Sequence, residues 1–283
     1  MPEITIPSSD YEEIKSASDM LNAIIKWRKD KKVPEQGYHS HAWLRGHSKR
    51  TYKLTPGVYR DEFTKQAANI YGPNLEEKRL NLEREILMEF RTAGASMIET
   101  QINEELYVLA QHYGLPTRLL DWTSNPLAAL FFAVCNEKTT EDGDVFLMQP
   151  TKMFPDPTPD TEEPQPYMRT IRHPQIQDAI GMSFWVDPSH KSKSGKVIVK
   201  EWPRILAFRP DNRAGRVGQQ SSCFTMHTHL AKPQTNDTLV RLKILGSKKG
   251  AIRDELRQLN INEFTVYHDL DHLSNEIKRG WGV

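Results

Sequence analysis

The apolar residues of this chain follow two spacings, one in the first part of the sequence and one after residue 117. In the first part they recur every three or four positions over residues 16–30, 75–99 and 102–113, which predicts three amphipathic helices. Ser16 and Ser18 are candidate caps for the first helix. Glu83 falls on the charged side of the second helix, so we expect it to face solvent.

After residue 117, short apolar or alternating runs predominate, as in β-strands. With one earlier run, they predict strands at residues 41–46, 117–122, 145–148, 197–200, 204–208, 221–227, 236–245 and 262–267. Two late segments suit helices, 248–258 and 269–278, and Asp269 is a candidate cap for the second. This order predicts an α+β fold whose core is a mixed, largely antiparallel sheet with N-terminal helices.

The pattern also suggests how the chain is organised. We expect residues 1–38 to form a helical lead-in and residues 39–283 to form a single domain. Residues 150–170 are rich in proline and have no apolar period. Such composition favours an exposed insertion rather than a packed element.

Residues 111–134 form the most apolar part of the chain. Gly114 is placed as a left-handed helix cap, and Pro126 opens a helix that is apolar on all sides, as in a buried core helix. Thr123, Ser124 and Asn125 are the three candidate caps of that helix. The segment nevertheless carries polar or amphipathic side chains, namely His112, Arg118, Asp121, Trp122, Thr123 and Ser124. Burying an unpaired charge is costly. Therefore these residues either are satisfied within the fold, as when Arg118 and Asp121 pair with each other or with the backbone, or form a site.

Arg45 is the second candidate centre of chemistry. In a strand over residues 41–46, Trp43 and Arg45 share one face, and Gly46 allows a turn or the close approach of a ligand. One interpretation is a surface arginine on an edge strand. The other is an arginine that binds an anion beside a glycine turn.

Composition narrows the class of protein. The chain has 283 residues, 37% of them hydrophobic, and no apolar run approaches the roughly 20 residues of a membrane span. A net charge of +1 argues against broad, nonspecific nucleic-acid binding. Two cysteines without ligand spacing and histidines without a third ligand predict no metal site. The N-terminus lacks the pattern of a secretory signal, so we expect a cytoplasmic protein.

Three motifs resemble the FRG domain, a family named for a Phe-Arg-Gly motif and found mostly in bacteria and their phages. They are Trp43-Leu-Arg-Gly-His, Leu54-Thr-Pro and Gln111-His-Tyr-Gly-Leu-Pro-Thr-Arg-Leu-Leu-Asp-Trp-Thr. Leu44 replaces the usual Phe, and His47 stands where Gln is common. Weaker similarity continues over residues 216–227 and 267–273. Some FRG proteins occur in bacterial defence, so the resemblance implies a possible role there.

The order of motifs is also similar, at lower specificity, to that of ADP-ribosyltransferases, which implies a fold of that kind and NAD as substrate. In those enzymes a basic residue and a hydroxyl hold NAD, and a Glu stabilises the charge that develops as nicotinamide leaves. Arg45, Thr123 and Gln220 occupy comparable places, and His112 or Asp121 would supply the charge that Gln220 cannot. The resemblance therefore implies catalytic Arg45, Thr123, Gln220 and His112, with cofactor contacts from Gly46, Arg118, Asp121, Trp122, Ser124 and Phe224.

Two functions follow as the main expectations. The first is an NAD-using enzyme, an ADP-ribosyltransferase or an NAD glycohydrolase. The second is a noncatalytic sensor that binds a nucleotide or another anion through Arg45, Arg118 and Arg216 in the same cleft. A nuclease is disfavoured because no metal-binding set of carboxylates stands out, and a protein-interaction role stays open. The expected partners are a nucleotide-type small molecule and a macromolecular target that the sequence does not identify.

Overall fold

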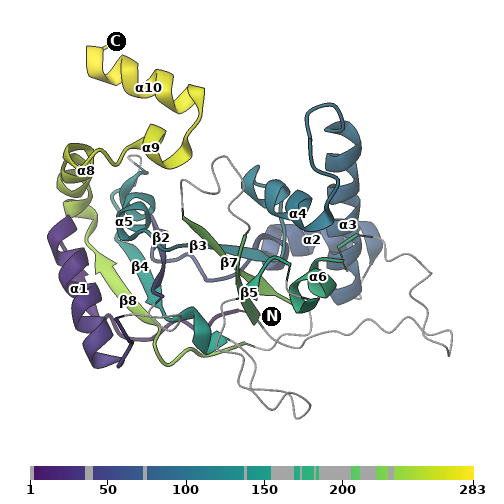
Figure 1. Cartoon of the computed structure of the whole chain (residues 1–283), viewed down its shortest axis with the longest axis horizontal. Helices are drawn as coiled ribbons and strands as arrows, with labels where there is room; N and C mark the ends of the chain where they lie inside the picture. Colours follow the sequence, from purple (N-terminus) through teal and green to yellow (C-terminus); the bar gives the residue numbers. More distant parts are fainter. Residues whose placement is uncertain are drawn as a thin grey trace.

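A computed structural model describes residues 3–35, 41–72, 75–136, 139–153, 169–172, 174–181, 183–184, 205–210, 221–228 and 233–283. In these residues eight strands form one sheet in the order β1-β8-β4-β2-β3-β7-β6-β5 (Figure 1). The strands are β1 (Glu12–Ile14), β2 (Trp43–His47), β3 (Leu119–Thr123), β4 (Gly143–Met148), β5 (Arg169–Thr170), β6 (Ile205–Arg209), β7 (Ser222–His227) and β8 (Val240–Ile244). The pairs β1–β8 and β5–β6 are parallel and the other pairs are antiparallel, which confirms the predicted mixed, largely antiparallel sheet.

Helices pack near both ends of this sheet (Figure 1). They are α1 (Ala17–Asp30), α2 (Asp61–Tyr71), α3 (Leu75–Ala93), α4 (Asn103–His112), α5 (Pro126–Val134), α6 (Pro174–Gly181), α8 (Lys249–Gln258), α9 (Glu263–Tyr267) and α10 (Leu270–Trp281). One apolar core joins α1, α5 and α8 to β2, β4 and β8. A second joins α3, α4 and α6 to β3, β6 and β7. The α+β class is therefore confirmed.

Several helix ends form as the sequence predicts. The Ser16 side chain accepts a hydrogen bond from Asp19 N and caps α1, and Asp269 caps α10 through His272 N. Gly114 has φ +81°, the left-handed conformation that suits a residue after a helix. Asn125 caps α5 ahead of Pro126. These contacts lie within a few residues of each other, so the local sequence is enough to specify them.

The structure contradicts two predictions, the strand at 262–267 and a solvent-facing Glu83, and it contains a helix that the sequence analysis did not predict. Residues 262–267 form helix α9 instead of a strand, because Asn262 and Thr265 make a reciprocal capping box that satisfies the first backbone N–H groups. Helix α2 was not predicted at all. Glu83 does not face solvent but is only 1% exposed. The predicted strand at 197–200 and residues 154–168 of the Pro-rich insertion lie outside the described residues.

The N-terminal segment packs with the rest of the chain. Strand β1 pairs in parallel with β8, and α1 contributes Met20 and Trp27 to the same core as α5. The Trp27 indole N–H donates to the carbonyl oxygen of Thr238 at 2.7 Å. Residues 12–30 thus complete one edge of the sheet and its helical cover.

The sheet is weakly paired at its centre, between β2 and β3. Each of these strands pairs with its other neighbour through five residue pairs, β2 with β4 and β3 with β7. Between β2 and β3 the register holds a single pair, Leu44 with Thr123. The two strands therefore diverge beyond that point, and polar side chains that follow Leu44 and precede Thr123 lie beside the opening.

Candidate functional site

A cleft of about 880 Å³ opens where β2 and β3 diverge. Its walls come from β2 and the loop after it, the start of α2, the end of α4, β3 and Tyr267. The volume falls in the range of sites that bind small molecules and cofactors. The lining residues are Leu44, Arg45, Gly46, His47, Ser48, Thr51, Tyr52, Lys53, Thr55, Tyr59, Arg60, Asp61, Glu62, Gln111, His112, Asp121, Trp122, Thr123, Phe132, Ser222 and Tyr267.

Arg45 lies in an interior strand, not on an edge, and its guanidinium spans the divergence of β2 and β3. Nη1 donates to the carbonyl oxygen of Asp121 at 2.7 Å, and Nε donates to His47 Nε2 at 2.9 Å. The carboxylate Oδ2 of Asp121 is 3.7 Å from Nη1. Burial lowers the pKa of Arg45, and the charge of Asp121 opposes that effect. Among the described residues Nη2 has no hydrogen-bond partner, so this nitrogen is available to a ligand.

His47 fixes Arg45 as a neutral acceptor. Its side chain is buried, and burial together with the nearby charge of Arg45 lowers its pKa to about 3. The His47 ring makes edge-to-face contacts with Phe146 and Tyr52, with ring centroids 5.1 Å and 5.9 Å apart, respectively. A neutral imidazole can accept from Arg45 through Nε2, whereas an imidazolium could only repel it. The orientation of Arg45 therefore depends on His47 staying uncharged.

Asp121 presents a carboxylate to the cleft in a fixed orientation. Its side chain is about half exposed. Gln111 Nε2 donates to Asp121 Oδ2 at 2.8 Å. The side-chain oxygen Oε1 of the same Gln111 accepts from the Thr117 hydroxyl. Two residues of the Gln111–Thr123 motif thus position a third. Arg45 and Gln111 both contact the same carboxylate oxygen, Oδ2.

The end of β3 brings three more predicted residues to the cleft or beside it. The Thr123 hydroxyl accepts from Asn125 N at 3.0 Å and is buried at the start of α5. The Trp122 indole donates to Thr225 at 3.1 Å and is 2% exposed, so the core holds most of this ring. Ser124 lies next to the lining residues, and its backbone N–H donates to the carbonyl oxygen of Ser221. His112 completes the wall from the last turn of α4.

The cleft also contains residues that sequence reasoning did not single out. Lys53 and Arg60 add cations to Arg45, and Asp61 and Glu62 add carboxylates to Asp121. Tyr52 is 47% exposed and adds an aromatic ring to the cleft. All of these residues follow closely after the Arg45–Gly46 pair, and that proximity is the signal that would have pointed to them.

Gly46 is needed for packing rather than for a turn. It lies inside β2, opposite Val145 of β4. A Cβ atom there would lie 2.0 Å from the carbonyl oxygen of Ala129 and 2.7 Å from the nitrogen of Ala133. The close approach is therefore to helix α5, although Gly46 also lines the cleft. This contact brings α5 against β2 at the back of the site.

Two predicted contact residues lie away from the cleft, in the second core. Phe224 is 3% exposed and stacks on Phe208 with ring centroids 5.6 Å apart. Arg118 is 1% exposed and is not among the lining residues. Pairing with Asp121 was one alternative that the sequence left open. In the structure Arg118 pairs with Glu83 instead. Gln220 and Arg216 lie outside the described residues.

Arg118 and Glu83 form a buried ionic network. Arg118 Nε donates to Glu83 Oε2 at 3.0 Å, and the Arg118 backbone N–H contacts Glu83 Oε1 at 3.1 Å. The hydroxyls of Tyr107 and Ser183 also donate to this carboxylate. Burial alone would lower the pKa of Arg118, but the charge of Glu83 raises it above its ordinary value. The network ties α3, α4 and α6 to the start of β3.

Comparison with known proteins yields one match. The family model described as the FRG domain matches residues 40–142, a range that contains β2, α2, α3, α4, β3 and α5. No curated protein and no solved structure shows significant similarity to the chain. In the described part of the chain, none of the helices combines the length and apolar character needed to cross a membrane.

Proposed function

The chain carries an FRG domain, and we propose that the cleft of this domain binds NAD as a substrate and cleaves its bond between ribose and nicotinamide. One observation carries the proposal. Arg45 is fixed by His47 and by the Asp121 carbonyl, with Nη2 still available, and it stands beside the Asp121 carboxylate. A guanidinium, which suits a phosphate, and a carboxylate, which suits a developing positive charge, thus lie in one cleft.

The cations and rings of the cleft suit the parts of a dinucleotide. A guanidinium binds phosphate oxygens through charge-assisted hydrogen bonds, and Arg60 and Lys53 can neutralise the remaining phosphate charge. The exposed ring of Tyr52 offers a stacking surface for a base or for nicotinamide. Thr123 lines the cleft at the end of β3, on the wall against which a ribose would lie.

The proposed reaction breaks one bond, the bond between nicotinamide and ribose. In NAD the ring nitrogen of nicotinamide carries a positive charge; when its bond to ribose breaks, the bonding pair goes to that nitrogen. Positive charge then moves to the ribose, where an oriented carboxylate stabilises it. Asp121 is held in place by Gln111 and Arg45, so little reorganisation is needed. Water, or a nucleophile of a target macromolecule, adds to the ribose and releases a proton to solvent.

A second candidate is noncatalytic binding of a nucleotide in the same cleft. The 3.7 Å approach of Arg45 Nη1 to Asp121 Oδ2 supports it. An arginine that partly neutralises this carboxylate weakens its effect on a developing cation. The two candidates agree on the ligand class and differ in turnover.

The test combines binding and turnover on the purified chain. We expect NAD to bind by calorimetry and free nicotinamide to accumulate by chromatography. Asp121→Asn should lower the release rate by about 100-fold with binding retained, the size of effect seen when one electrostatic group is removed. Arg45→Lys should weaken binding by about tenfold. Asp254→Asn, on the exposed side of α8, is the matched control.

The outcomes separate the candidates. Binding without release would reject NAD cleavage and leave the noncatalytic module. No binding of NAD, ADP-ribose or ATP would reject both. Unchanged release in Asp121→Asn would remove Asp121 from the mechanism.

A further inference from the structure

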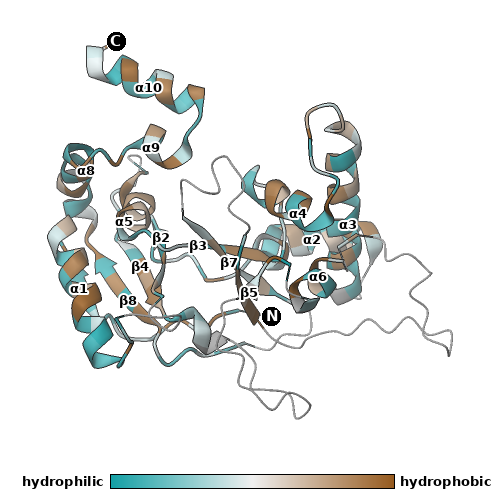
Figure 2. Cartoon of the chain, viewed as in Figure 1, coloured by the Kyte–Doolittle hydropathy of each residue, from teal (hydrophilic) through white to brown (hydrophobic). Residues whose placement is uncertain are grey.

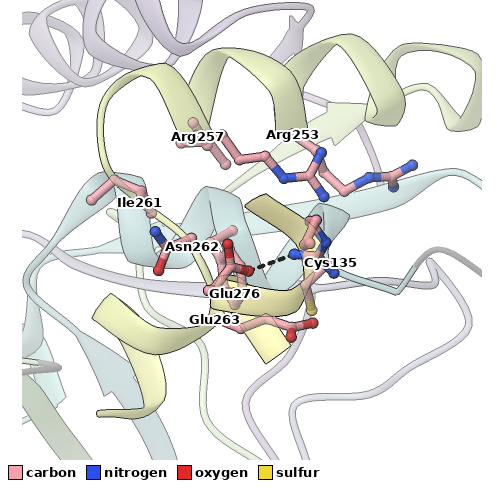
Figure 3. Close-up of a pocket in the computed structure, with 10 residues that line it drawn as sticks. Cys135, Arg253, Arg257, Ile261, Asn262, Glu263 and Glu276 are labelled. Carbon is pink, nitrogen blue, oxygen red and sulfur yellow. Dashed lines mark hydrogen bonds and ion pairs between the residues drawn. The ribbon is translucent and has the colours of Figure 1, made fainter. Parts of the chain in front are cut away.

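Helix α10 contacts the rest of the chain through polar residues. It extends from the body beyond α9 (Figure 1). Two of its charged residues, Glu276 and Arg279, line a small pocket with Cys135, which follows α5, and Arg253 of α8 (Figure 3). Arg279 donates to Glu276 there. The polar side of α10 therefore faces the rest of the chain.

The apolar side of α10 faces away. Leu270 is 79% exposed, Ile277 is 54% exposed and Trp281 is 82% exposed. With Leu273, which is partly buried, they recur every three or four residues and form one stripe. Figure 2 shows hydrophobic and hydrophilic residues alternating along this helix. No residue of α10 is buried. Soluble proteins rarely expose such a continuous stripe without a partner for it.

We propose that this stripe pairs with the same stripe of a second copy of the chain, with the two helices antiparallel. The charges beside the stripe carry the proposal. Asp271 and Lys278 are seven residues apart, so they lie on the same side of the helix, two turns from each other. Antiparallel pairing of two α10 helices about their centre places Asp271 of one copy opposite Lys278 of the other, twice by symmetry.

Other arrangements fit the charges less well. In a parallel pair, the flank of one helix that carries Asp271 and Lys278 would face the opposite flank of the other. That flank packs toward the chain's own body through Glu276, so Asp271 and Lys278 would find no partners there. A membrane surface would favour a polar side rich in lysine and arginine, whereas α10 carries both signs. A helix of 12 residues buries a small area, so the dimer is weak and depends on concentration.

The test is sedimentation velocity of the full chain over a concentration series at low salt. We expect the mean mass to rise toward that of a dimer. The pair Ile277→Asp and Trp281→Ser should abolish the rise, whereas Ile25→Asp on the exposed side of α1 should not. Thermal unfolding of each variant checks that it still folds.

Charge reversal makes the test specific for the antiparallel arrangement. Asp271→Lys and Lys278→Asp should each weaken self-association by about fivefold, because each creates two like-charge contacts. An equimolar mixture of the two variants should associate as the wild type does, since every contact is then between opposite charges. A mixture that stays monomeric would overturn the arrangement. A monomeric wild type, or one that binds phosphatidylserine vesicles through the stripe, would overturn the proposal.

Discussion

Arg45 Nη1 lies 2.7 Å from the carbonyl oxygen of Asp121, across the point where β2 and β3 diverge. A backbone N–H would normally satisfy that carbonyl in a continuous sheet. Here a side chain does so, and the same guanidinium reaches His47 through Nε. One residue thus closes the sheet and lines the cleft, which makes Arg45 important both to stability and to binding.

Arg45→Met should lower the free energy of unfolding by about 1–3 kcal/mol, because it leaves the Asp121 carbonyl and His47 Nε2 without their donor. Arg45→Lys keeps the charge and can still donate to one of the two acceptors. Its loss of unfolding free energy should therefore be smaller than that of Arg45→Met. Urea unfolding measures both. Lys15→Ala, which removes an exposed pair with Glu13, should change stability by less than about 0.5 kcal/mol. Equal stability of Arg45→Met and wild type would contradict the bridging role.

The pKa of His47 predicts acid sensitivity. The unfolded chain takes up a proton on this histidine near its ordinary pKa of about 6.5, whereas the folded chain resists it down to about 3. The contribution to stability is therefore complete above about pH 6.5 and is lost as the pH falls toward 3, by at most about 1.4 kcal/mol per pH unit. His47→Gln keeps an acceptor but does not titrate.

The measurement is urea unfolding of both proteins between pH 7 and pH 4. We expect the wild type to lose more stability than His47→Gln over that range. Buried or paired carboxylates titrate in both proteins, so the difference isolates His47. Parallel curves would show that His47 is not held neutral in the folded chain.

The Glu83–Arg118 pair predicts a strong asymmetry between single and double variants. Glu83→Leu or Arg118→Met alone leaves a buried charge unpaired and should cost about 3–5 kcal/mol of stability. Glu83→Leu combined with Arg118→Met removes both charges and should recover much of that loss. A double-mutant cycle by urea unfolding measures the coupling. Additive losses would show that the two charges do not depend on each other.

Gly46→Ala should destabilise the chain by several kcal/mol, on the order of the cost of overpacking a core. The added methyl would meet the backbone of Ala129 at 2.0 Å, and helix backbone cannot rotate away as a side chain can. Gly181→Ala is the matched control, because nothing lies within 4 Å of its added Cβ and its φ is not positive. Thermal unfolding compares them. An unchanged midpoint in Gly46→Ala would show that α5 can move away from β2.

A good part of the site follows from the sequence. The Arg45–Gly46 and Gln111–Thr123 motifs predicted a site, and Arg45, His112, Asp121, Trp122 and Thr123 do line one cleft. Arg118 belongs to the same motif but enters the core. Nothing local distinguishes it from its neighbours, because its partner Glu83 is 35 positions earlier.

The sequence alone supplied the short sets of candidates from which the helix caps Ser16, Asn125 and Asp269 come, most of the element order and the α+β class. Those features depend on side-chain period and on contacts within a few residues, which the order of residues states directly. Only the tertiary structure decided that Glu83 is buried and that β2 and β3 diverge. Burial of a charge and the pairing of strands depend on which distant segments meet, and the free energy of such contacts is shared among residues that no local pattern connects.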